Sequence, residues 1–270
     1  MHLTLRSELK KLLTAPAFRW GVLLVSALCT TACIYTDYSI SKSYSFLEML
    51  SGSMKPIRDT IPAGMVWRSG LDGQYARLFL PIATSLSYVP QLCTERESGL
   101  IRFSLIRQNR LRYALGKALS ALLGGGLIVL LGFLLYGGLV YLLYPMNPEV
   151  DPELLGIMQD TWWKTLLGKF LLGVSMTAPS LLLCAFLRDR WLITCLPVLY
   201  YFVLDTAASL AFFSENQSYL RQIIDYFRPD GAAHLIVSFS WSRLFILLIL
   251  WSISPILFCL RLRRKEDCGA

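Results

Sequence analysis

Six stretches of this sequence are apolar over roughly the length that a helix needs to cross a lipid bilayer, and this feature most constrains the fold. A transmembrane helix takes about 20 apolar residues to cross about 30 Å of hydrocarbon. A mean hydropathy of +0.52 with 16% charged residues is too apolar for a soluble domain. We therefore expect an all-α membrane protein in which residues 1–270 form one transmembrane domain. The six expected spans are 20–36, 74–93, 118–143, 165–187, 191–213 and 244–260.

The distribution of Lys and Arg predicts that both termini lie in the cytoplasm. Cytoplasmic segments keep positive charge because its translocation is opposed. With both termini inside, residues 1–19, 95–117, 188–190 and 261–267 hold most of the basic residues, and acidic residues are more frequent in the outer loops. The net charge of +8 is explained by this topology and by anionic lipids at the inner leaflet, so no nucleic-acid partner is needed.

The segments before the first and last spans have patterns of their own. The first segment, LTLRSELKKLLTAPAF, places leucines at helical spacing with basic residues around them, which is typical of a helix lying in the membrane interface. The outer loop 214–243 contains an amphipathic stretch, an RPDG turn and an apolar stretch that is too short to cross the membrane. That order predicts a re-entrant helical hairpin that dips partway into the outer leaflet.

Ionisable residues within the spans are costly and therefore often functional. Lys169 and Asp205 lie at similar depth in the fourth and fifth expected spans. They are interpreted either as a buried ion pair or as a contribution of Asp205 to a translocation path. The seven cysteines fall in spans or on the inner side, so neither disulfides nor a metal site is expected.

The cytoplasmic loop between the second and third spans carries a recognisable order of residues. Glu95-Arg96-Glu97 is followed by Gly99, an apolar turn, Arg110, Tyr113 and a Gly116-Lys117 pair that opens the next span. This order resembles the corresponding loop of type-2 membrane subunits of ATP-binding-cassette (ABC) transporters. The family usually has Pro or Ser before the arginine, where this chain has Gln108 and Asn109.

The resemblance implies a function and a set of partners. The loop 95–110 would be a coupling helix that sits in a groove of a separate ATPase subunit, and its contact residues would be Glu95, Arg96, Glu97, Gly99, Leu100, Ile101 and Phe103. The chain would work with a second permease subunit, identical or related, as an exporter in a bacterial plasma membrane. The substrate stays open among drugs, peptides, lipids and glycans.

The motifs of the sequence are consistent with ATP being bound by a separate chain. It contains no G-x-x-x-x-G-K-[ST] phosphate-binding loop, and the glycine run 124–126 lies within the third span with no Lys-Ser or Lys-Thr after it. The chain itself is therefore expected to have no enzymatic activity and to bind no cofactor. ATP and Mg²⁺ would be bound by the partner ATPase.

Two other classes of protein share features with this sequence. A channel or a secondary transporter that does not use ATP is the main alternative, although secondary transporters often show internal repeats, and none is found here. The segment DGQYAR, 72–77, matches the start of the motif of CDP-alcohol phosphotransferases, which are metal-dependent membrane enzymes. The glycine and two aspartates that continue that motif are replaced here by Leu86, Pro90 and Thr94, so its metal site is incomplete.

Overall fold

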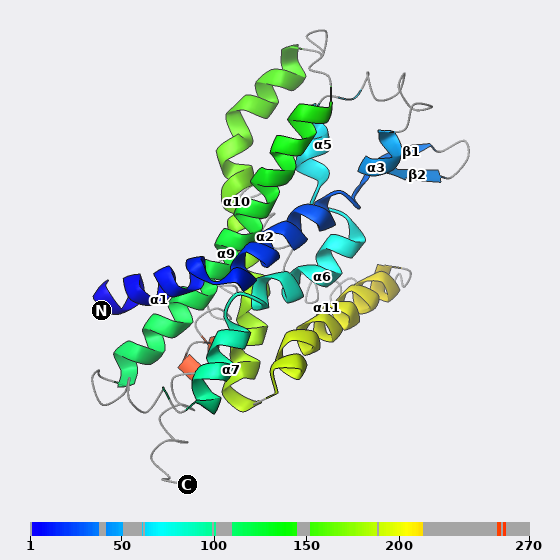
Figure 1. Ribbon diagram of the computed structural model, residues 1–270. Helices are drawn as coiled ribbons and strands as arrows, with labels where there is room; N and C mark the ends of the chain where they lie inside the picture. The colour runs from blue at the N-terminus through cyan, green and yellow to red at the C-terminus, as the bar shows by residue number, and fades with distance from the viewer. Residues whose placement is uncertain are drawn as a thin grey trace.

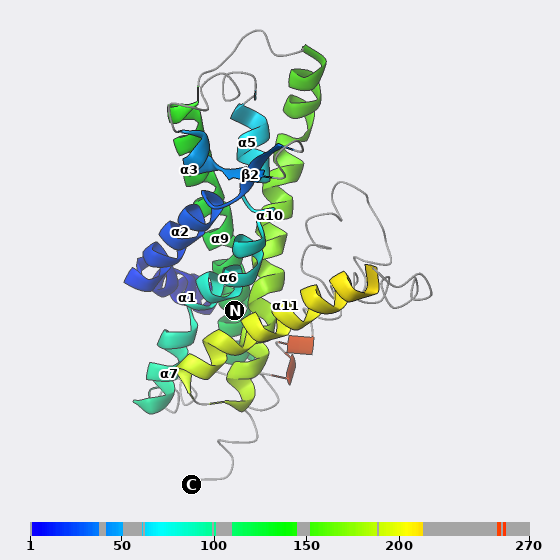
Figure 2. The ribbon, with the colours of Figure 1, turned by 90° about the vertical axis from the view of Figure 1, so that its right-hand side faces the viewer.

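The structure is a computed structural model that describes residues 2–37, 42–50, 61, 63–98, 100, 110–144, 152–187, 189–212, 253–254 and 256–257. The described chain is mostly helical, as expected. Its two longest helices, α9 (Arg110–Leu143) and α10 (Pro152–Phe186), run side by side along the molecule (Figures 1 and 2). A third long helix, α11 (Arg190–Phe212), leaves the end of α10 at an angle.

Three helical segments are long and apolar enough to cross a membrane, namely Arg112–Leu143, Trp162–Phe186 and Arg190–Ala208. A fourth would be added if the bent pair formed by the first two helices were one span. The three segments match the third, fourth and fifth expected spans. The expected hairpin 214–243 and nearly all of the expected sixth span, 244–260, lie outside the described residues.

The first expected span, 20–36, is wrong in both of its bounds. Helix α1 (His2–Thr14) is followed after a bend of 65° by α2 (Pro16–Cys29), which begins on a proline and is only 14 residues long. The hydroxyls of Thr30 and Thr31 donate to the carbonyls of Ala27 and Leu28, so the end of the helix is satisfied locally. The chain then turns into a strand.

Short elements follow α2. Strand β1 (Cys33–Asp37) pairs antiparallel with β2 (Lys42–Ser45), and the helices α3 (Phe46–Met49) and α5 (Ala63–Ser69) come next. The buried Phe46 ring stacks on Tyr144 just after the end of α9, with ring centroids 5.7 Å apart. This contact holds the short elements against one end of the long helices.

The second expected span, 74–93, is not one helix. It consists of α6 (Gln74–Ser85) and α7 (Val89–Glu97), which are separated by residues 86–88 and point in different directions (Figure 1). Pro90 lies in the first turn of α7 and has no N–H to donate to the carbonyl of Leu86. Apolar composition continues across this break, although the hydrogen-bond ladder of the helix does not.

Glycines of α9 allow α10 to approach closely. A Cβ on Gly125 would lie 1.9 Å from Thr177 Oγ1, and one on Gly173 of α10 would lie 2.6 Å from the carbonyl oxygen of Gly125. In contrast, a Cβ on Gly138 would meet nothing within 4 Å. The close contact of α9 with α10 therefore requires a glycine at position 125, whereas position 138 has room for a side chain.

Gly125→Ala is expected to destabilise the protein by about 2 kcal/mol because the added methyl must push α10 away. Gly138→Ala is the matched control in the same helix. It is expected to be neutral or stabilising by up to about 1 kcal/mol, since alanine favours helix more than glycine does. Thermal unfolding in mild detergent measures both variants. Equal behaviour of the two would contradict the close contact between α9 and α10.

Candidate functional site

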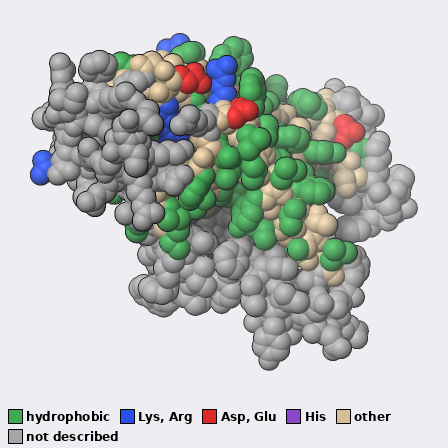
Figure 3. All heavy atoms as spheres, turned by 90° about the horizontal axis from the view of Figure 1, so that it is seen from below, with side chains coloured by type: hydrophobic (Ala, Val, Ile, Leu, Met, Phe, Trp, Pro, Cys, Tyr) green, Lys and Arg blue, Asp and Glu red, His purple; other side chains and the backbone are tan. Residues whose placement is uncertain are grey.

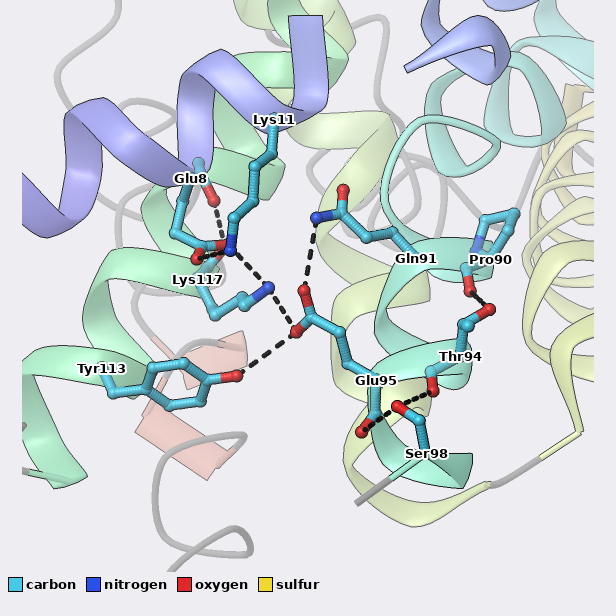
Figure 4. A network of polar contacts seen from close by, with 10 residues as sticks. Glu8, Lys11, Pro90, Gln91, Thr94, Glu95, Ser98, Tyr113 and Lys117 are labelled. Atoms are coloured by element: carbon cyan, nitrogen blue, oxygen red, sulfur yellow. Dashed lines mark hydrogen bonds and ion pairs between the residues drawn. The ribbon is translucent and has the colours of Figure 1, made fainter. Parts of the chain in front are cut away.

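A buried lysine joins three helices at the end of the molecule where α7 stops. Lys117 Nζ on α9 lies 2.6 Å from Glu8 Oε2 on α1 and 2.5 Å from Glu95 Oε2 on α7 (Figure 4). The Lys117 side chain is 7% exposed, and the Glu8 and Glu95 side chains are 8% and 14% exposed. One ammonium group thus lies between two carboxylates and shares its single positive charge with them in a region with little water. We call Lys117, Glu8 and Glu95 the Lys117 cluster.

Neighbouring polar groups complete the hydrogen bonding of the Lys117 cluster. Tyr113, one turn before Lys117 in α9, donates from its hydroxyl to Glu95 Oε2 at 3.3 Å, and Gln91 Nε2 of α7 donates to Glu95 Oε1 at 3.3 Å. The other oxygen of the Glu8 carboxylate, Oε1, lies 3.1 Å from Lys11 Nζ. The two carboxylates therefore accept bonds on both of their oxygens, and such satisfaction is what makes buried charges tolerable.

Burial of Glu8 follows from its place in the sequence of α1. Glu8 precedes the buried Leu12 by four residues, and residues at this spacing share one face of a helix. That face packs against α9, while Lys10 and Lys11 remain exposed. A single acid on the apolar face of an amphipathic helix was therefore a readable signal of a buried partner, and the sequence analysis missed it.

Arg96, the next residue after Glu95, reaches a different helix. Its Nη1 donates to the backbone carbonyl of Cys184 and, at 3.3 Å, to that of Leu187. These carbonyls lie at the C-terminal end of α10, where helix carbonyls lack partners and a positive charge is favoured. Successive residues of α7 thus connect to α9 and α1 on one side and to α10 on the other.

The remaining residues expected in the coupling loop differ in their environment. Glu97, at the end of α7, is exposed, and Leu100 is 52% exposed. Gly99, Ile101 and Phe103 lie outside the described residues. Within the described part of the loop, Glu95 and Arg96 face the protein and Glu97 faces outward.

Lys169 has a different partner from the one that its depth suggested. Lys169 Nζ lies 3.2 Å from Asp72 Oδ1 and 5.7 Å from the centre of the Phe133 ring. Asp72 precedes α6 and is 61% exposed, so it reaches Lys169 from the edge of the fold. Asp205 lies half-buried on α11. Asp72 and Lys169 are 97 positions apart in the sequence, so helical spacing gave no hint of the pair.

The surface around this end of the molecule separates charge from apolar area. Seen from below in Figure 3, acidic and basic side chains gather on one part of the face, and hydrophobic side chains cover much of the remaining described surface. The exposed hydrophobic residues of α11 include Trp191, Leu199, Phe202, Val203 and Leu210. An apolar exterior of this kind is normal for a helix that faces lipid.

The described chain thus combines helices that are long and apolar enough to cross a membrane with a buried charge cluster at one end. Comparison with protein-family models and with curated proteins finds no match for this sequence. Among the residues that the structure describes, no group of three or more His, Cys, Asp or Glu side chains is placed to hold a metal ion. The Lys117 cluster and Arg96 are therefore the candidate site.

Lys117→Met is expected to destabilise the protein by about 3 to 5 kcal/mol because it leaves Glu95 without its ion-pair partner and Glu8 with only the exposed Lys11. Adding Glu8→Gln and Glu95→Gln to Lys117→Met is expected to restore much of this loss. Lys11→Met serves as the control, since Lys11 is 58% exposed and a surface pair contributes little. Chemical or thermal unfolding in detergent measures the series, and additive losses in the triple variant would contradict the cluster.

Stability is also expected to fall at acidic pH because of Glu8. Burial raises its pKa, but the charge of Lys117 and hydrogen bonds from Lys117 and Lys11 outweigh burial and leave the pKa below the ordinary value of 4.5. The stabilisation is therefore complete above pH of about 5 and is lost as the pH falls through the folded-state pKa. Melting temperatures between pH 7 and pH 3 are expected to fall less in Glu8→Gln than in the wild type.

Proposed function

We propose that this chain is the membrane-spanning subunit of a type-2 ABC transporter, most consistent with export, that couples to a separate ATPase subunit through residues 95–110. It would span the plasma membrane of a bacterium six times with both termini inside. It would pair with a second permease subunit, identical or related. The observation that carries the proposal is the connection of Glu95 and Arg96 to three other helices.

A coupling segment must transmit force to the transmembrane helices. Glu95 contacts Lys117 of α9, which also holds Glu8 of α1, and Arg96 contacts the carbonyl end of α10. A displacement of the end of α7 would thus act on α1, α9 and α10 together. A loop that served only as a connector would not need an ion pair to α9, which is shared there with α1, together with hydrogen bonds to the end of α10.

The described segments that are expected to be cytoplasmic lie together at one end of the molecule, and this supports the proposed topology. The N-terminal helix, the end of α7, the start of α9 and the junction of α10 with α11 meet at one end of the molecule through Glu8, Lys117, Glu95 and Arg96. These are the segments whose basic residues predict a cytoplasmic location. The hairpin β1–β2 and α3 lie toward the opposite end (Figure 2).

Glu97 is the sharper probe of ATPase contact because it is exposed, whereas reversal of Glu95 would break the Lys117 cluster. Expressing the chain with its genomic neighbours and purifying it in mild detergent is expected to yield a bound ATPase. Glu97→Lys is expected to weaken that association roughly tenfold by placing like charges together. Leu47→Lys adds a positive charge at an exposed position at the opposite end and is expected to leave association unchanged.

The result of co-purification decides between the classes of transporter. Unchanged association of Glu97→Lys would contradict a contact of the ATPase with this part of the loop. An assembly free of any ATPase that conducts ions or solutes would replace the proposal with a channel or a secondary transporter.

A further inference from the structure

Pro179 leaves a carbonyl of α10 without its helical donor. A helical residue normally donates its N–H to the carbonyl four residues earlier, and proline has no N–H. The carbonyl of Ser175 is therefore free of this bond. Tyr201 of α11 supplies a substitute, because its buried hydroxyl donates to the Ser175 carbonyl oxygen at 3.4 Å.

The next carbonyls of α10 accept hydrogen bonds from two further parts of the chain. Tyr88, in the break between α6 and α7, donates its hydroxyl to the Thr177 carbonyl at 3.2 Å. Ser254 donates to the Ala178 carbonyl at 2.7 Å. Tyr88 and Ser254 are buried. The turn of α10 just before Pro179 is thus held from three sides by hydrogen bonds away from water.

Close packing fixes the same turn on its remaining side. Gly125 of α9 approaches Thr177, and Gly173 approaches the backbone of Gly125. Interiors packed this closely resist small displacements. The part of α10 that precedes Pro179 is therefore anchored to α9, α11 and the break before α7.

The part of α10 after Pro179 is held at its far end. The helix ends at Phe186, and the N–H of the next residue, Leu187, still donates to the Leu183 carbonyl at 2.9 Å. Arg96 donates to the carbonyls of Cys184 and Leu187. Arg96 belongs to α7, and the break at 86–88 separates α7 from α6, so α7 can move without carrying α6 with it.

We propose that residues 180–187 of α10 form a lever that pivots at Pro179 and is moved through Arg96. The source of the force rests on the proposed function, in which an ATPase displaces the end of α7. Arg96 is then a positioning residue that transmits this displacement to α10. The short connection at 187–190 transmits it further to α11. Prolines within helices are common sites of bending because one hydrogen bond is missing.

Hydrogen–deuterium exchange on the purified full-length chain in lipid nanodiscs tests the lever without any ATPase. Arg96→Gln is expected to speed exchange roughly fivefold across 180–187, because the charge-assisted contact is lost, and to leave 165–178 unchanged. Arg190→Gln, at the exposed start of α11, is the matched control and is expected to leave both segments unchanged. Faster exchange confined to 184–187, or extending into 165–178, would overturn the pivot.

A second variant tests the pivot itself. Pro179→Ala restores an N–H that can bond to the Ser175 carbonyl. When it is added to Arg96→Gln, the faster exchange is expected to shrink toward the last turn. If the double variant exchanges across 180–187 as fast as Arg96→Gln alone, Pro179 is not the pivot.

The complex with an ATPase separates the lever from the proposed function. When the complex is trapped with ATP, hydrogen–deuterium exchange over 180–187 is expected to change in the wild type and to stay unchanged in Arg96→Gln. The ATPase is expected to remain bound to the wild type and to the variant. A bound ATPase that changes exchange equally in both would overturn the role of Arg96. Failure of any ATPase to co-purify would overturn the proposed function, whereas the exchange of the chain alone would still decide whether the lever exists.

Discussion

The positions of α1, α7 and α9 relative to one another depend on the ion pairs that Lys117 makes with two buried carboxylates. Removing carboxylates from water costs several kcal/mol for each ion unless a countercharge and hydrogen bonds compensate. Lys117 supplies the countercharge, and Tyr113, Gln91 and Lys11 supply the hydrogen bonds. The contact cannot be loosened at one helix without exposing the charge of another, so the three helices act as a unit.

Helix α10 is the element that the other parts of the described fold share. It packs against α9 through glycines, accepts hydrogen bonds from Tyr201, Tyr88 and Ser254 near Pro179, and ends at carbonyls held by Arg96. Polar bonds between helices are needed here because apolar side chains gain little by leaving lipid for one another. Interhelical hydrogen bonds lie just before the proline, and the part after it combines buried side chains with the Arg96 contact at its end.

Much of the fold was predictable because apolar length is a local property. The third, fourth and fifth expected spans fall on α9, α10 and α11 and match their C-terminal ends closely, but α9 begins at 110 and α10 at 152, before the expected starts at 118 and 165. The first and second spans failed where local hydrogen bonding outweighed apolar composition, at Thr30 and Thr31 after α2 and at Pro90 in α7. For the site, the loop was found by its residue order, but its residues were assigned to a partner, whereas Glu95 and Arg96 face the chain's own helices.

The sequence by itself determined that this is an apolar helical chain, where its long helices run and which of its segments carry positive charge, because hydropathy and helical periodicity depend on neighbours along the chain. Only the tertiary structure decided the partners of the buried charges. Glu8 and Lys117 are 109 residues apart in number, and Asp72, not Asp205, lies beside Lys169. Ion pairs between helices depend on the angle and depth at which the helices pack, and no spacing in the sequence records these.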